Sequence, residues 1–289
     1  MSIPEASTKR PCPWPGVSET DWAAAWRERL QRSGLEANLE RAGLSQEEFW
    51  ERFGSWMDTL RKNGHPGVLL DRVLEHVRED DSVLDIGAGS GAFALPLAQR
   101  VNRVTAVEPS AMQVSRLESS IRECEITNVR VVRTAWEEVD VPGIGRHDVV
   151  LAVHSLQMPD IREAVRRMIE ASTRLVILVH PVEHDLTNAL RSLGVGTGPN
   201  YLYLYNTMVQ MGLRPRIEFV TRTFRVPLAQ QLDMLRCNPG LDDSLCELLR
   251  QRLHAEGRVF TLHDEPHVAR WRSDAVMYLE TNGSERRDA

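Results

Sequence analysis

A glycine-rich turn directly after an apolar run constrains this chain more than any other feature. Residues 83–92 read VLDIGAGSGA, and a stretch rich in alanine and leucine follows at residues 93–99. Because glycine lacks a Cβ, Gly87 and Gly89 permit a tight turn and the close approach of a ligand to the backbone. The small residue at position 91 or 92 lets the next helix pack against the strand. The segment therefore predicts a buried strand, a turn, and a helix N-terminus that faces a ligand.

Two acidic residues at fixed offsets from this turn narrow the choice of ligand. Glu108 closes the next apolar run about 20 residues later, where a carboxylate can accept hydrogen bonds from both hydroxyls of a ribose. The glycine spacing alone also fits a dinucleotide site. Asp85, however, lies two residues before Gly87, at the carboxyl end of the predicted strand. A carboxylate there repels a pyrophosphate and suits a ligand that carries an ammonium or a sulfonium group.

Two short motifs resemble those of a known superfamily. LDIGAGSG (84–91) is similar to the first motif of class I S-adenosylmethionine-dependent methyltransferases, and VEPSAM (107–112) is similar to their second. The resemblance covers roughly residues 65–225 and a final strand. It implies S-adenosylmethionine as the cofactor. It also implies an α/β fold with a doubly wound, Rossmann-like, mostly parallel sheet of seven strands, of which the last is antiparallel.

The same resemblance implies which residues contact the cofactor. They follow successive strands and comprise Asp85, Gly87, Ala88, Gly89, Gly91, Glu108, Pro109, Met112, Ala135, Trp136 and Val153. Met112 is either an apolar wall for adenine or a core residue. The family commonly has an aspartate where this chain has Ala135. Backbone groups of Ala135 and Trp136 could then form hydrogen bonds with the adenine, or the Trp136 ring could stack on it. If the alignment slips by two residues, the Glu137 carboxylate would accept a hydrogen bond from the adenine amino group.

The candidate catalytic residue is His154, which follows the apolar run at residues 148–153. In open α/β sheets the ligand lies beyond the carboxyl ends of the strands, so His154 is expected near the methyl end of the cofactor. A histidine there can act as a general base on a hydroxyl, thiol or amine. The alternative is a structural histidine that is hydrogen-bonded close to the sulfonium, and the sequence leaves both open.

Two further histidine pairs have a spacing that occurs in metal sites, namely His180 with His184 and His263 with His267. Such pairs can bind a metal when they lie on a helix. A proline lies within each pair, which disfavours a regular helix, and no third ligand is evident. We therefore expect no metal site.

Residues 1–64 are predicted to form an N-terminal helical cap segment. Trp22, Trp26 and Leu30 have helical spacing after Asp21, and residues 45–48 read SQEE, a capping-box sequence at the start of another helix. The aromatic rings of these helices either cap the cofactor site or only pack on the core.

Residues 65–289 are predicted to form the methyltransferase domain, because apolar strands alternate with helical patterns. After a fifth strand at 175–179, a helix at 200–212 and strands at 217–226 and 275–280 are expected. A helical insertion at about 227–272 separates the last two strands, with helices at 228–235 and 242–254. Residues 282–289 are expected to be disordered.

Bulk properties exclude several classes of protein. The net charge of −6 disfavours nucleic acid as a partner, because surfaces that bind it are normally basic. The four cysteines are scattered without a CxxC pair, which argues against a disulfide framework or a zinc knuckle. No apolar run approaches the roughly 18 residues of a membrane span. A cytoplasmic location is expected, and a homodimer is left open.

The sequence thus predicts a methyltransferase that transfers a methyl group from S-adenosylmethionine to a small or medium-sized molecule. The acceptor atom (O, N, S or C) is left open. One alternative is a protein or RNA methyltransferase, and another is a catalytically inactive regulatory or partner protein that binds the cofactor. An NAD-dependent dehydrogenase is a weaker alternative, because it explains neither Asp85 nor the helical prefix.

Overall fold

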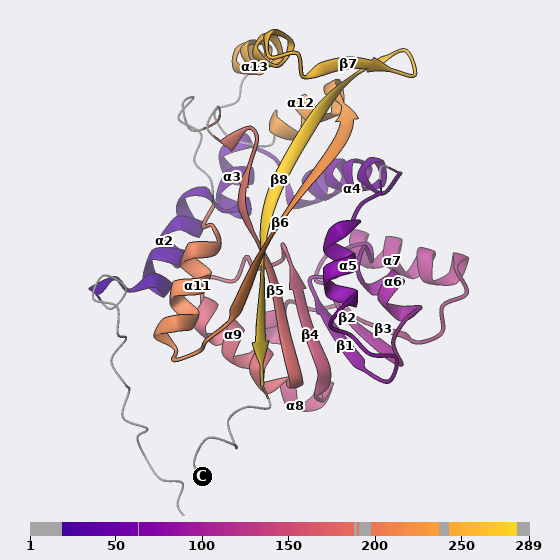
Figure 1. Ribbon diagram of the computed structural model, residues 1–289, viewed down its shortest axis with the longest axis vertical. Coiled ribbons are helices and arrows are strands. Elements are labelled where there is room, and N and C mark those ends of the chain that lie inside the picture. The colour runs from indigo at the N-terminus through magenta and orange to yellow at the C-terminus, as the bar shows by residue number, and fades with distance from the viewer. Residues whose placement is uncertain (1–18, 63, 188–189, 191–197, 237–242, 282–289) are drawn as a thin grey trace, which may run out of the picture.

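The computed structural model describes residues 19–62, 64–187, 190, 198–236 and 243–281 (Figure 1). Within these residues, one sheet has eight strands in the order β3-β2-β1-β4-β5-β8-β6, and β7 pairs with β8. Residues 1–18 of the predicted cap and the predicted tail at 282–289 lie outside the described residues.

The sheet is parallel on one side and antiparallel on the other. The parallel part consists of β1 (Ser82–Ile86), β2 (Arg103–Val107), β3 (Val129–Val132), β4 (His147–Val153) and β5 (Ser172–His184). The strand β8 (Glu265–Glu280) lies between β5 and β6 (Arg216–Pro227) and is antiparallel to both. The predicted doubly wound sheet with an antiparallel last strand is confirmed. The short strand β7 (Val259–Leu262), which pairs with β8, was not predicted.

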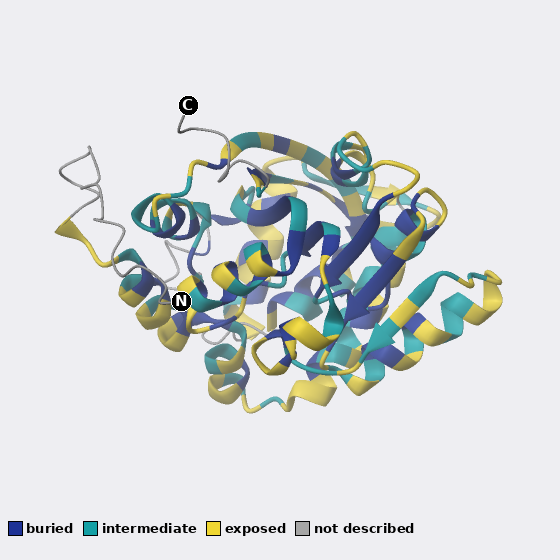
Figure 2. Ribbon diagram, turned by 90° about the horizontal axis from the view of Figure 1, so that it is seen from below, coloured by how far each residue is buried: buried dark blue, intermediate teal, exposed yellow. Residues whose placement is uncertain are grey.

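Helices cover both faces of the sheet, because the central strands are apolar on both sides. Val83 and Val149 belong to one buried cluster, whereas Leu84 and Val150 belong to another. The first cluster includes residues of α5 (Val68–Leu74), α6 (Ala94–Ala98) and α7 (Ala111–Glu123). The second includes residues of α2 (Trp22–Ser33), α9 (Ile161–Glu170) and α11 (Tyr201–Gln210). Figure 2 shows the buried strands inside a layer of helices with exposed outer sides.

Two more N-terminal helices, α3 (Leu35–Ala42) and α4 (Gln46–Lys62), follow α2. The Ser45 N–H donates to Glu48 Oε2 at 2.8 Å, and the Glu48 N–H donates to Ser45 Oγ at 3.2 Å. These reciprocal bonds confirm the predicted capping box. A 3₁₀ helix, η1 (Trp136–Glu138), and α8 (Val141–Ile144) connect β3 to β4. Over the described residues, none of the helices combines the length and apolar character of a membrane span.

The N-terminal helices share a core with the sheet. The Trp26 side chain is fully buried, and its indole N–H donates to the Met158 carbonyl at 2.9 Å. Its ring lies 5.2 Å from the imidazole of His180 on β5. Helix α2 is therefore held against the sheet by both an apolar and a polar contact.

Strands β5 and β8 are longer than the sequence suggested, whereas β6 matches its predicted range of 217–226 to within one residue at each end. The last strand begins at Glu265 and not at Ala275, and β5 continues to His184. The end of β5, the end of β6 and the beginning of β8 form an arm that carries α12 (Leu228–Arg236) and α13 (Asp243–Ala255) (Figure 1). These two helices match the predicted helices of the insertion. The division of the chain at residue 64 stays a prediction.

We expect Trp26→Ala to lower the free energy of unfolding by about 3–5 kcal/mol, because it empties a buried site and leaves a carbonyl without its donor. Urea denaturation of the variant and of wild type would measure the difference. Trp271→Ala is the matched control, because Trp271 is exposed on β8. If both variants lost the same stability, helix α2 would not be anchored through Trp26.

Candidate functional site

The three glycines of the turn after β1 all have positive φ, but their surroundings differ. A Cβ on Gly87 would lie 2.3 Å from Ser155 Cβ in the loop after β4, and a Cβ on Gly91 would lie 2.6 Å from Leu117 Cδ1 of α7. A Cβ on Gly89, where φ is +56°, would have no described neighbour within 4 Å. Gly87 and Gly91 therefore allow close packing, whereas Gly89 borders open space that a ligand can enter.

The carboxylate of Glu108, directly after β2, lies against this turn. Its Oε2 accepts a hydrogen bond from the Gly89 N–H at 2.9 Å, and its Oε1 accepts one from the Ser110 N–H at 2.9 Å. The side chain is buried, and burial raises its pKa. Each carboxylate oxygen keeps a second lone pair, so hydroxyl groups of a ligand can still donate to Glu108.

Asp85, on β1, has a buried carboxyl group, and one of its two oxygens lacks a hydrogen-bond partner within the described part of the chain. It is 2 % exposed, and its Oδ2 has no hydrogen-bond partner among the described residues. Burial and the nearby charge of Glu108 raise the pKa of Asp85 to about 7, although a hydrogen bond from the Ala94 backbone opposes the shift. A cationic group beside Asp85 would stabilise its charged form. The residues at the turn thus fit a ligand with a positive charge and hydroxyl groups.

Other predicted cofactor residues lie at or just beyond the carboxyl ends of β1 to β4. Ala88 is buried, Pro109 is exposed, and Met112, Ala135 and Val153 are partly exposed. This edge of the sheet is where ligands bind in doubly wound folds. Their contacts with a cofactor stay predictions.

The Trp136 side chain has a different position from the one expected. It is 2 % exposed, and its indole N–H donates to the Ala164 carbonyl of α9 at 3.2 Å. The ring therefore faces the core, which argues against one of the three alternatives for the adenine contact, the stacking of this ring. A contact through the Trp136 backbone stays a prediction.

Helix α4 lies beside the glycine turn. The Arg61 guanidinium donates to Ser90 Oγ at 2.8 Å, and Asp58 pairs with Arg116 of α7 at 3.4 Å. These contacts connect the N-terminal helices to the turn and to the helix after β2. A capping role for them stays a prediction.

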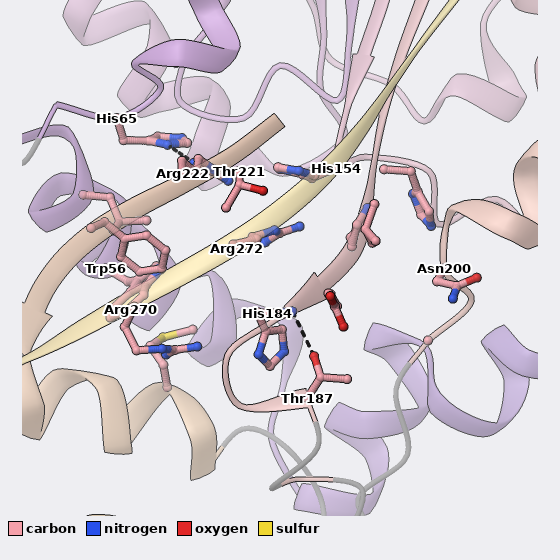
Figure 3. A pocket seen from close by; sticks show the side chains of 18 of the residues that line it. Trp56, His65, His154, His184, Thr187, Asn200, Thr221, Arg222, Arg270 and Arg272 are labelled. Atoms are coloured by element: carbon pink, nitrogen blue, oxygen red, sulfur yellow. Dashed lines mark hydrogen bonds between the residues drawn. The ribbon is translucent and has the colours of Figure 1, made fainter. Parts of the chain in front are cut away.

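A cavity of about 760 Å³ lies between the arm of the sheet and the N-terminal helices (Figure 3). Its lining residues come from α2, α3, α4, α5, β5, β6, β8, α12 and nearby loops. Among the described residues, His154 lines the cavity, and none of the predicted cofactor-binding residues does. The cavity is therefore next to the glycine turn and not part of it.

The buried carboxylate of Asp274 on β8 organises one wall of this cavity. Its Oδ1 lies 2.8 Å from His154 Nε2 and accepts a hydrogen bond from Arg272 Nε at 2.8 Å. Its Oδ2 accepts one from Arg222 Nε at 3.2 Å. Burial alone would raise the pKa of Asp274, but His154 and the two guanidinium groups together hold it far below its usual range.

The same contact fixes the state of His154. An ionised carboxylate only accepts, so the proton of the neutral imidazole lies on Nε2, and Nδ1 has no partner among the described residues. Burial first, and then the charge of Arg272, lower the pKa of His154 to about 4. His154 is therefore neutral near pH 7 and presents an unprotonated nitrogen.

Sequence reasoning missed Asp274, Arg222, Arg272 and their neighbour His65, which lies 2.7 Å from Arg222. A signal existed, because polar residues alternate along β8 at positions 270, 272 and 274. His180 and His184 also line the cavity. Over the described ranges, no cluster of three or more His, Cys, Asp or Glu side chains is arranged to hold a metal ion.

Comparisons with known proteins agree with this geometry. Residues 83–174 match the family model described as "Methyltransferase domain". The YcgJ protein of Bacillus subtilis is similar in structure, with a TM-score of 0.51, 17 % identity, and 73 % of this chain and 97 % of that one covered. A proposed methyltransferase of Bacillus halodurans has a TM-score of 0.53, 12 % identity, and coverage of 75 % and 99 %.

Curated relatives match over shorter stretches. An uncharacterized protein of Haemophilus influenzae is 28 % identical over 166 residues, which are 54 % of this chain and 60 % of that protein. A tRNA/tmRNA (uracil-C(5))-methyltransferase of Pseudomonas putida is 43 % identical over 60 residues, 21 % of this chain and 17 % of that protein. The chain thus spans less than two thirds of the length of either.

The strand order, the glycine turn and the family match define the class of this protein. Residues 83–174 match a methyltransferase domain, and the sheet has the doubly wound fold of class I methyltransferases, whose cofactor is S-adenosylmethionine. The predicted superfamily is confirmed.

Gly87 and Gly89 of the turn provide a matched pair of variants. We expect Gly89→Ala to lower the free energy of unfolding by only about 1–2 kcal/mol, the cost of a Cβ at positive φ. Gly87→Ala should cost more, because its Cβ also overlaps Ser155. Gly89→Ala should nevertheless weaken binding of S-adenosylhomocysteine in calorimetry. Unchanged affinity in Gly89→Ala would show that the open space beside this residue is not occupied by the cofactor.

Asp85 should make stability depend on pH. Its folded pKa of about 7 lies above the unfolded value of 3.8. The contribution of Asp85 to the free energy of unfolding is therefore fully present below about pH 4. Between about pH 4 and pH 7 it falls by about 1.4 kcal/mol for each pH unit, because the carboxyl group is then protonated in the folded protein and ionised in the unfolded chain. Asp85→Asn should be more stable than wild type at pH 8, and the advantage should shrink at pH 5. Urea denaturation at both pH values would measure it, and an advantage independent of pH would contradict the raised pKa.

Proposed function

We propose that this protein transfers a methyl group from S-adenosylmethionine to a small or medium-sized molecule held in the cavity. One observation carries the proposal. The loop after β4 joins the two sites, because His154 lines the cavity and the adjacent Ser155 packs against Gly87 of the glycine turn. A pocket of about 760 Å³ also has the size of typical small-molecule sites.

The residues at the glycine turn would hold the cofactor, which supplies an electrophilic methyl group on a sulfonium. Asp85 would pair with a positively charged group through its unpartnered oxygen. Glu108 would accept hydrogen bonds from ribose hydroxyls while its carboxylate stays fixed by two backbone N–H groups. Gly89 provides the room for the backbone to approach the ligand.

His154 would orient the acceptor. Its Nδ1 can accept a hydrogen bond from an O–H, N–H or S–H group, and the bond from Nε2 to Asp274 holds the ring in place. With a pKa of about 4 the imidazole is a weak base. It would therefore align the nucleophile, and it would take up the acceptor's proton only as the bond to the methyl carbon forms.

Methylation of RNA has less support as the function. The match to the Pseudomonas putida RNA methyltransferase covers 60 residues, and a match to a probable ribosomal RNA small subunit methyltransferase A of Methanothermobacter thermautotrophicus covers 152 residues, so both fall short of half of this chain. The net charge of −6 also opposes binding to a polyanion.

The proposal predicts where a transferred label is found. With S-adenosylmethionine labelled in the methyl group, we expect label in the small-molecule fraction of a cell extract and not in its protein or RNA fractions. Label in either macromolecular fraction would overturn the proposed substrate class. Binding of S-adenosylhomocysteine without any transfer would instead favour a cofactor-binding regulatory protein.

Once an acceptor is found, His154→Gln should lower kcat by at least about tenfold, because the nucleophile loses its partner. The affinity for S-adenosylhomocysteine should be unchanged, since the substitution lies outside the glycine turn. His254→Gln is the matched control, because His254 is exposed on α13. Equal kcat values in the two variants would remove His154 from the mechanism.

A further inference from the structure

Two arginines face each other on one wall of the cavity. In the sheet register, Arg222 of β6 lies directly opposite Arg272 of β8, and His184 of β5 lies opposite Arg272 on its other side. Like charges directly opposite each other destabilise a strand pair. Figure 3 shows the Arg272 side chain pointing toward the middle of the cavity, close to His154.

The acidic groups nearby compensate these arginines only in part. Asp274 is one carboxylate shared by Arg222 and Arg272. Asp185, which follows β5, is likewise shared by Arg258 and Arg270, and Arg258 also pairs with Glu256. The group formed by Arg222, Arg272 and Asp274 therefore carries one excess positive charge. Glu183, which also lines the cavity, is exposed to solvent.

Three of the histidines around the arginines add no charge to this wall. Burial lowers the pKa of His65 to about 3 and that of His154 and His180 to about 4, so all three are neutral near pH 7. The charged groups that face the cavity are then Arg222, Arg270, Arg272 and Glu183, with Asp274 behind Arg222 and Arg272 and with Asp185 paired to Arg270. The part of the wall formed by Arg222 and Arg272 is cationic, and a low-dielectric cavity strengthens its attraction for an anion.

The Arg272 guanidinium also has N–H groups that are available to a ligand. Its Nε is used by Asp274, whereas no described residue accepts from Nη1 or Nη2, and neither nitrogen belongs to the buried unpaired atoms. The side chain is 27 % exposed, compared with 13 % for Arg222. Two parallel N–H groups on one edge of a guanidinium match the two oxygens of a carboxylate or a phosphate.

The remaining lining is apolar on one side of the arginines. It is formed by Trp56 and Leu60 of α4, Phe224 of β6, and Met234 and Leu235 of α12. Figure 3 shows Trp56 on the side of the cavity where Arg270 lies. An occupant of the whole cavity thus meets an apolar surface and a cationic wall.

We infer that the methyl acceptor is an amphipathic anion. Its carboxylate or phosphate group binds the Arg272 guanidinium, and its apolar body lies against the residues of α4, β6 and α12. The assignment of this anion as the acceptor rests on the proposed function, whereas the binding itself can be measured without methyl transfer.

Calorimetry at constant ionic strength would test the inference, with octanoate and octyl phosphate as probes and 1-octanol as the uncharged analogue. We expect at least one of the two anions to bind at least tenfold more tightly than octanol, and the stronger anion identifies the acidic group. Arg272→Gln should weaken that binding at least tenfold. Equal binding of all three probes, or no binding, would overturn the inference.

Two further variants keep the result interpretable. Arg272→Gln leaves Asp274 paired with Arg222, so the fold should be retained. Arg272→Lys keeps the charge but removes the planar fork, and it should recover part of the affinity. Arg130→Gln, at an exposed position on β3, is the control and should bind like wild type. A loss of affinity in Arg130→Gln equal to that in Arg272→Gln would overturn the inference.

The two proposals fail in different ways. Binding of S-adenosylhomocysteine to the same preparation, without binding of either anion, would overturn the anionic acceptor and leave the methyltransferase function in place. Binding of an anion without binding of S-adenosylhomocysteine would retain the cationic site and overturn the proposed function.

Discussion

The carboxylate of Asp274 is the group on which the cavity wall depends. It accepts hydrogen bonds from side chains of β6 and β8 and contacts the histidine after β4. Without it, the partly buried guanidinium groups of Arg222 and Arg272 would face each other on neighbouring strands with no carboxylate between them. Removing one partner from a buried ion cluster leaves an uncompensated charge, which is more costly than the cluster itself is stabilising. The position of His154 is thus tied to the charge balance of the arginines.

The parallel and the antiparallel half of the sheet carry charged groups of opposite sign near the loop that follows β4. Asp85 and Glu108 belong to β1 and the end of β2, and they suit a cation. Arg222 and Arg272 belong to β6 and β8, and they suit an anion. The halves meet at residues 154 and 155, where one loop contacts both. The acidic pair Asp85 and Glu108 and the arginine pair Arg222 and Arg272 thus belong to different strands of the sheet.

The glycine turn was predictable because all its information is local. Strand, turn and helix lie within about 20 residues, and Asp85 and Glu108 have offsets from the glycines that do not depend on distant pairing. Helix boundaries such as the capping box at Ser45 are local in the same sense. The domain class followed from these segments.

The cavity was not predictable in the same way. Arg222 and Arg272 are 50 positions apart, and only the register of β6 against β8 makes them neighbours. The alternation of polar residues at 270, 272 and 274 indicated one face of a strand, but it did not show what lay opposite. The buried position of the Trp136 ring was not predictable for a related reason, because its partner Ala164 belongs to a helix 28 residues away.

The place of β8 in the sheet also sets the order in which the two sites can be completed. Among the described strands it comes last in the chain, yet it lies between β5 and β6. The strands that carry the glycine turn can pair with one another as soon as β4 is available. The wall of the cavity requires a segment that is synthesised more than 80 residues after β5 begins. During synthesis, the half that suits the cofactor can therefore assemble while β6 still lacks its partner in the sheet.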